Sequence, residues 1–337
     1  MRYLEYIYFA AYESQFNKQP KRAYWRMVST VRWLLQISLV LWLSIGAAAA
    51  TQGKPGCRKR CGNVDIPYPF GIGFAGCYVD EWFEITCNNA FHPPKPFLKR
   101  INLEVLNVSL DHGTIRVNNP VLIYQDCSGK PSNDRKSWNG GPFSFSETYT
   151  RFTAVGCSAL AYITQDDVIN GGCMSFCKQD TTAATNGNCN GLECCQTQVP
   201  PGLQSFTANL ESTSFNVSIS DHKQETCKYA FMVDHKWLSS KFFDPHAVKD
   251  KGYVPAVLDW RVNATCKSVE GNNDSTSNTS TSFCGTNARC SVANHSSGVT
   301  CACDRGYEGN PYLPEGCQGT KPTYLLVIYS IFVYGYI

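Results

Sequence analysis

Hydrophobic and polar residues alternate along much of the chain, which is the pattern of half-buried β-strands. Within residues 99–121, alternate positions from Ile101 to Val105 are hydrophobic, and Ile115-Arg116-Val117 repeats the pattern after a turn at His112-Gly113. These segments predict two strands joined by a turn.

The same pattern continues towards the middle of the chain. Val121-Leu122-Ile123-Tyr124 predicts a short buried strand that ends near Cys127, and residues 128–142 are rich in loop-forming residues. Phe143-Ser144-Phe145 and the segment from Thr150 to Gly156 alternate again. No stretch keeps a 3.6-residue period, so the sequence predicts a mainly β fold.

Residues 57–87 contain four cysteines around a segment that cannot be helical. Pro67 and Pro69 lack backbone donors and bias the preceding residues towards extended geometry. The run from Trp82 to Cys87 is aromatic and β-branched, which predicts a short strand.

Cysteine usage indicates an oxidising compartment. The chain has 337 residues and 18 cysteines, an even number that is typical of a disulfide framework. The spacing does not match two CxxC pairs, and few of the six histidines lie near cysteines, so we expect no metal site. Cys194 and Cys195 are adjacent and should take different partners.

The two ends of the chain differ from its middle. Residues 1–26 are expected to be an upstream extension, and residues 27–50 have the charged start, hydrophobic core and small-residue cleavage site of a signal peptide. A retained signal anchor is the alternative, but the hydrophobic run is short for a membrane span. Residues 323–337 are uncharged and hydrophobic, which is expected of a truncated transmembrane segment or of an artificial end of the gene model. We expect weak membrane association through this tail.

Net charge excludes one class of partner. The formal charge is +3, and no motif supports nucleic-acid binding. Within the expected mature chain, positive charge is biased to residues 51–151, which hold 12 basic and nine acidic side chains, whereas residues 152–322 hold 12 basic and 16 acidic ones.

The cysteine-rich start of the predicted mature chain resembles a known family. Cys57-x3-Cys61-Gly62-Asn63, the run Ile66-Pro67-Tyr68-Pro69-Phe70-Gly71-Ile72-Gly73, Gly76-Cys77 and Phe83-x3-Cys87-Asn88 resemble the galacturonan-binding module of plant wall-associated receptor kinases. The resemblance implies a secreted, cell-wall-facing module over residues 51–160 that binds pectin.

Two later segments resemble the same family. The segment Gly191-Leu192-Glu193-Cys194-Cys195-Gln196 resembles its second cysteine-rich section, which we expect over residues 161–260. Residues 261–318 are similar to an epidermal growth factor (EGF)-like domain, with a single residue between Cys301 and Cys303. The family pairing implies the bridges Cys266–Cys290, Cys284–Cys301 and Cys303–Cys317. The expected fold class is therefore a series of small, disulfide-rich β modules followed by an EGF-like domain.

Enzymatic activity is not expected, and no cofactor is implied. The chain has no nucleophile elbow, no HExxH motif and none of the kinase signature motifs. Acid pairs such as Asp80-Glu81 are more readily explained as solvated surface carboxylates, since neighbours on a strand face opposite sides.

Pectin is a regular polyanion, so a binding surface needs spaced cations and flat rings. Arginine and lysine match carboxylates by charge, and arginine also by its planar fork. The candidate polysaccharide-binding residues are Arg58, Lys59, Arg60, Tyr68, Trp82, Lys95, Lys99, Arg100 and Arg116, with Phe91 as a further aromatic.

Two alternatives to pectin binding stay open. In the first, the chain is a structural or protein-binding ectodomain that acts on extracellular proteins through the EGF-like domain. In the second, it is a fragment of a full receptor. The sequence does not determine how the first twelve cysteines pair.

The chain contains six N-glycosylation sequons, which support a glycoprotein of the secretory pathway with an extracellular or cell-wall location. Their acceptors are Asn107, Asn216, Asn263, Asn273, Asn278 and Asn294.

Overall fold

The computed structural model describes residues 52–125, 127, 135–138, 140–176, 189–212, 227–239, 245–266, 283–292 and 298–319. The expected extension, signal peptide and C-terminal tail lie outside these residues. Within the described ranges, no helix has the length and hydrophobicity needed to cross a membrane.

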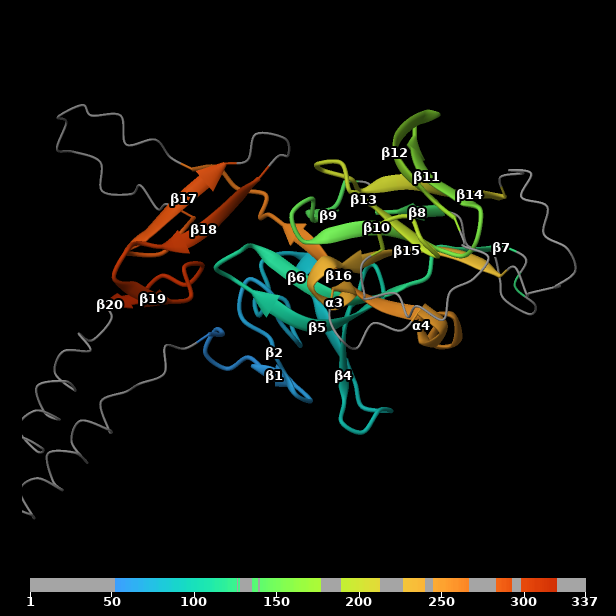
Figure 1. Cartoon of the computed structure of the whole chain (residues 1–337). Helices are drawn as coiled ribbons and strands as arrows, with labels where there is room; N and C mark the ends of the chain where they lie inside the picture. The colour runs from blue at the N-terminus through green and yellow to red at the C-terminus, as the bar shows by residue number, and fades with distance from the viewer. Residues whose placement is uncertain are drawn as a thin grey trace, which may run out of the picture. The chain divides into compact units, whose positions relative to one another are not determined.

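The described part is mainly β (Figure 1). Its largest sheet has six antiparallel strands in the order β3-β4-β5-β6-β16-β9. Their bounds are β3 Ile85–Asn88, β4 Lys95–Leu98, β5 Leu103–Ser109, β6 Thr114–Pro120, β9 Phe143–Phe145 and β16 Tyr253–Trp260.

Two four-stranded sheets use the intervening residues. One has the order β13-β10-β15-β7, with β7 Ile123–Gln125, β10 Thr150–Val155, β13 Cys194–Gln198 and β15 Lys228–Asp234. The other has the order β12-β11-β14-β8, with β8 Arg135–Ser137, β11 Ala159–Gln165, β12 Val168–Ser175 and β14 Ser205–Ser212.

Three small ribbons complete the strands. They pair β1 Arg60–Cys61 with β2 Val64–Asp65, β17 Ala288–Val292 with β18 Val299–Cys303, and β19 Tyr307–Gly309 with β20 Cys317–Gly319.

Strand formation follows the alternation of the sequence. Leu103 and Val105 of β5 are buried, and a register shift between Val105 and Asn107 bends this strand. Every residue of β15 is buried, because both faces of the strand are covered. Ala230 and Met232 belong to one hydrophobic cluster, and Tyr229, Phe231 and Val233 belong to another. Pro255 lies in the part of β16 that pairs only with β6, so its missing backbone donor interrupts no second ladder.

The predicted strands over β5, β6, β9 and β10 are confirmed, whereas three local expectations need correction. The run from Trp82 begins as the 3-10 helix η1 Glu81–Phe83, because the Asp80 side chain caps it by accepting from the Trp82 amide at 2.8 Å. Residues 128–142, expected as a loop, contain β8, which gains its partner from β14.

The third correction concerns helices, which the sequence did not indicate. The structure has α3 His235–Leu238 and α4 Pro245–Lys251. Four and seven residues are too few to establish a helical period. Proline at the first position of α4 and Gly252 in a left-handed conformation after it are common end signals.

One hydrophobic core extends across the expected boundary at residue 160. Strand β16 pairs with β6, and β10 pairs with both β13 and β15. Residues 51–160 and 161–260 therefore share sheets and do not form two separate units. At the centre, Trp260 is 1% exposed and makes an edge contact with Phe70, with ring centroids 5.2 Å apart.

Eight disulfides join described cysteines. In the C-terminal part they are Cys266–Cys290, Cys284–Cys301 and Cys303–Cys317, the three pairs that the resemblance implies. The others are Cys57–Cys77, Cys61–Cys87, Cys127–Cys227, Cys173–Cys195 and Cys189–Cys194. Cys194 and Cys195 do take different partners.

The EGF-like part is fixed to the rest of the fold by the side chain of Asn310. Its amide nitrogen donates to the carbonyl oxygens of Gln52 and Tyr68, both at 2.6 Å. The Tyr312 ring lies 5.3 Å from that of Trp260. Residues from both ends of the described chain thus share one packed core.

Candidate functional site

The basic triplet Arg58, Lys59 and Arg60 is exposed at the first ribbon. Arg58 Nε donates to the Arg60 carbonyl at 2.8 Å, and Arg60 Nε lies 2.7 Å from Asp65 Oδ1. Side chains in this ion pair are 62% and 70% exposed, so solvent competes strongly with it. The bridges at Cys57 and Cys61 fix the backbone on both sides of the triplet.

Cations around the β3–β4 hairpin are each matched by a carboxylate. The pairs are Lys95–Glu104 at 2.9 Å, Lys99–Glu84 at 2.8 Å and Arg100–Glu81 at 3.7 Å. The Glu84 carboxylate raises the pKa of Lys99, chiefly through their hydrogen bond. An external polyanion must therefore compete with a protein carboxylate at each of these positions.

The aromatic candidates differ in accessibility. Tyr68 is 8% exposed within the core, with Lys54 Nζ 4.3 Å from its ring centroid, so its ring faces are not open to a sugar. Burial also raises the pKa of Tyr68. Trp82 is half-buried, and the Arg100 guanidinium covers its ring at 4.1 Å. Phe91 is 41% exposed, with Lys95 Nζ 5.0 Å from its centroid.

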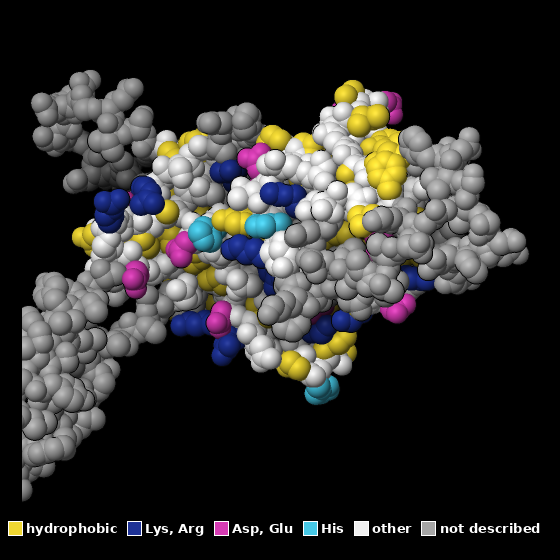
Figure 2. Space-filling view, viewed as in Figure 1, with side chains coloured by type: hydrophobic (Ala, Val, Ile, Leu, Met, Phe, Trp, Pro, Cys, Tyr) yellow, Lys and Arg dark blue, Asp and Glu magenta, His cyan; other side chains and the backbone are white. Residues whose placement is uncertain are grey.

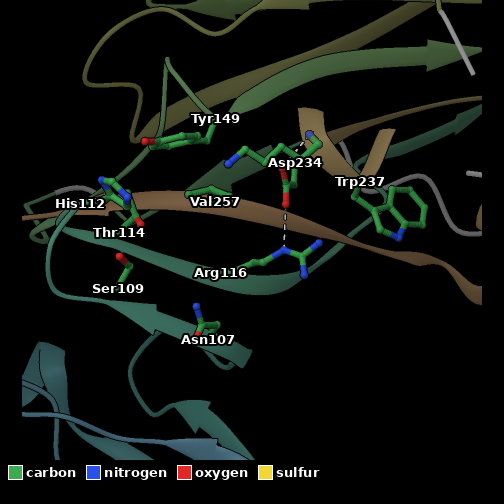
Figure 3. Close-up of a pocket in the computed structure, with 10 residues that line it drawn as sticks. Asn107, Ser109, His112, Thr114, Arg116, Tyr149, Asp234, Trp237 and Val257 are labelled. Carbon is green, nitrogen blue, oxygen red and sulfur yellow. Dashed lines mark hydrogen bonds and ion pairs between the residues drawn. The ribbon is translucent and has the colours of Figure 1, made fainter. Parts of the chain in front are cut away.

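Arg116 is the sequence candidate that lines a cavity. This Arg116 cavity has a volume of about 530 Å³. Its lining residues are Asn107, Ser109, His112, Thr114, Arg116, Tyr149, Asp234, Lys236, Trp237 and Val257 (Figure 3). Figure 2 shows basic and histidine side chains gathered near the middle of the face that carries β5, β6 and α3.

A buried carboxylate fixes the cationic side of the Arg116 cavity. Asp234 is 6% exposed and is the N-cap of α3. Its Oδ1 accepts from the Lys236 amide at 2.9 Å, and its Oδ2 accepts from Arg116 Nε at 2.9 Å. One side chain therefore begins the short helix and orients the guanidinium on β6.

Tyr149 forms a second wall, just before β10. The Lys236 ammonium lies 5.6 Å from its ring centroid, and the His112 ring lies 6.1 Å away. His235 stacks on Tyr149 with centroids 6.2 Å apart, and its Nδ1 lies 3.1 Å from the Tyr149 carbonyl oxygen. The cavity thus combines cations, aromatic rings and small polar side chains, a mixture typical of small-molecule sites.

Sequence reasoning identified Arg116 but missed His112, Tyr149 and the segment Asp234–Trp237. Arg116 and Asp234 are 118 residues apart, and no local pattern joins them. The available signal was the composition of Asp-His-Lys-Trp, which places a capping residue directly before a histidine, a lysine and an indole.

Two of the six predicted glycosylation sites fall in the described residues. Asn107 is exposed on β5 at the edge of the Arg116 cavity, and Asn263 is exposed after β16. The predictions at Asn216, Asn273, Asn278 and Asn294 lie outside the described ranges.

The fold and the bridges define a disulfide-rich β module, and family comparisons agree. Residues 57–119 match the wall-associated receptor kinase galacturonan-binding family, and residues 186–269 match the wall-associated kinase family. The chain therefore matches two wall-associated kinase family models and is homologous to these receptors over about 85% of its own length. Neither match is a kinase domain.

Three relatives from Arabidopsis thaliana illustrate the similarity. Wall-associated receptor kinase 2 is 36% identical over 84% of this chain, and wall-associated receptor kinases 5 and 1 are 33% and 34% identical over 86% and 85%. The chain spans only 37% to 38% of the length of these relatives. No solved structure matches the chain.

Proposed function

We propose that this chain is an extracellular ectodomain that binds de-esterified galacturonan, the acidic backbone of pectin. The match of residues 57–119 to a galacturonan-binding family is the observation that carries the proposal. The bridges support an oxidising, extracellular location, since such bridges persist there.

The exposed cations explain how a polyanion could be held. Arg58 and Lys59 make no ion pair with a described carboxylate, and Arg60 makes one that is open to solvent. Single exposed charge pairs contribute only about 0–1 kcal/mol each. Affinity must therefore come from several contacts along the polymer, which favours long, de-esterified oligomers over short ones.

A polysaccharide array probed with the whole secreted chain tests the proposal. Binding should be confined to acidic, de-esterified pectic samples and should weaken with salt, because salt screens exposed charges. Reversing Arg58, Lys59 and Arg60 to glutamate should reduce binding without reducing secretion. The control variant reverses Arg289 and Arg305, two exposed arginines of the EGF-like part. Failure of the secreted chain to bind any de-esterified galacturonan sample on the array would contradict the proposed function.

A further inference from the structure

We infer that the Arg116 cavity is a subsite for one galacturonate residue of the bound chain. This inference deepens the proposed function and rests on it. To the exposed cations on the surface it adds an open cavity, lined by Arg116 together with residues that sequence reasoning missed.

The charge arrangement favours a carboxylate. Nε of Arg116 donates to Asp234, whereas the two terminal nitrogens of Arg116 make no hydrogen bond to a described residue. These nitrogens remain available for an incoming carboxylate, and Asp234 holds the group in place. The Lys236 side chain is exposed and adds a second positive charge. Arg116 and Lys236 supply two positive charges at the wall of the cavity, whereas Asp234 supplies one negative charge. Both oxygens of Asp234 already accept hydrogen bonds from the protein.

The remaining walls suit a pyranose ring. Tyr149 and Trp237 are half-buried aromatic residues at opposite ends of the cavity, with Asp234 and Arg116 between them, as Figure 3 shows. Ser109 and Thr114 add hydroxyl groups that can donate to or accept from sugar hydroxyls. A volume of about 530 Å³ falls within the range of small-molecule sites, roughly 300–1,000 Å³. The walls are already held by protein contacts, which lowers the ordering cost of binding.

The subsite is composite. Arg116 lies in the region that matches the galacturonan-binding family, and Lys236 and Trp237 lie in the region that matches the wall-associated kinase family. Tyr149 lies between the two regions. Strand pairing between β6 and β16, and between β10 and β15, brings these parts together. Both regions are therefore needed to bind the uronate.

The inference is tested by titrating trigalacturonate into the whole secreted chain and measuring the heat of binding by calorimetry. Lys236→Ala leaves the backbone amide that Asp234 caps, and we expect affinity to fall about five-fold, the range of an exposed charge pair. Arg116→Lys keeps the charge but loses the planar fork, and we expect a loss of about ten-fold. Lys251→Ala, on the exposed end of α4, is the matched control and should bind as the parent does.

Competition distinguishes the ligand classes. Monogalacturonate should displace trigalacturonate from the parent chain at high concentration, whereas galactose and inorganic phosphate should not. Equal displacement by phosphate or by galactose would overturn a uronate subsite. If the parent binds trigalacturonate and the Lys236 and Arg116 variants bind equally well, the inference fails while the proposed function stands. If the parent binds no galacturonate oligomer, the proposed function fails and takes the inference with it.

Discussion

Replacing Asn310 with alanine should destabilise the whole described fold, although Asn310 belongs to the EGF-like part. Its side chain is fully buried and makes three hydrogen bonds. Two run to the carbonyls of Gln52 and Tyr68, and in the third its Oδ1 accepts from the Tyr312 amide at 3.0 Å.

The size of the effect follows from what the substitution leaves unpaired. The Gln52 carbonyl keeps a second donor, the Tyr68 amide at 2.9 Å, so it loses little. The Tyr68 carbonyl and the Tyr312 amide lose their hydrogen bonds to the Asn310 side chain. Each unsatisfied buried group costs about 1–3 kcal/mol. We expect a loss of about 3–5 kcal/mol in the free energy of unfolding, which corresponds to roughly 10 °C in Tm for a chain of this size.

Thermal unfolding of the secreted chain, with its bridges intact, measures this loss. Asn170→Ala is the matched control, because Asn170 is exposed and its amide makes only a long 3.4 Å contact with Gln165. A single transition that moves down by about 10 °C supports one shared core. A change as small as that of the control would refute the reasoning, as would a separate early transition of the EGF-like part alone.

Three further predictions concern the surface, the pH dependence and the bridges. Asn107→Gln should remove a glycan at the edge of the Arg116 cavity and raise affinity for oligogalacturonide several-fold, whereas Asn263→Gln should not; calorimetry on both variants checks this. Burial raises the pKa of Asp259, so its contribution to stability is present at low pH and is lost as pH rises through the folded-state pKa. Asp259→Asn should therefore gain stability over the parent at pH 7 but not at pH 3, and equal shifts in Tm at both pH values would contradict the assignment. Replacing Cys303 with serine opens a loop of 14 residues and should cost about 3 kcal/mol; unfolding curves identical to the parent's would contradict this.

The sequence predicted local strands well because their signal is local. Alternation around Leu103 and Val105 sufficed to place β5, and the turn at His112-Gly113 placed the start of β6. The sequence could not predict which strands pair across long separations. Strand β16 lies beside β6 because both bury hydrophobic residues in the same core. The residues next to β16 in the sequence carry no signal for this pairing.

The candidate site divides along the same line. The basic triplet is exposed because charged neighbours cannot be buried without partners, which sequence reasoning can anticipate. The burial of Tyr68 and the orientation of Arg116 by Asp234 depend on distant segments. Residues of the α3 segment were missed because a four-residue helix leaves no periodic pattern.

The central claim is that the chain binds galacturonan by recognising the carboxylates of the polysaccharide. It is tested most directly by changing only those carboxylates on the ligand. Oligogalacturonides of one length, fully de-esterified or fully methyl-esterified, can be titrated into the secreted chain at low and high salt. The account predicts saturable binding of the de-esterified oligomer that weakens with salt, and little binding of the esterified oligomer. Equal affinity for both forms, independent of salt, would contradict it.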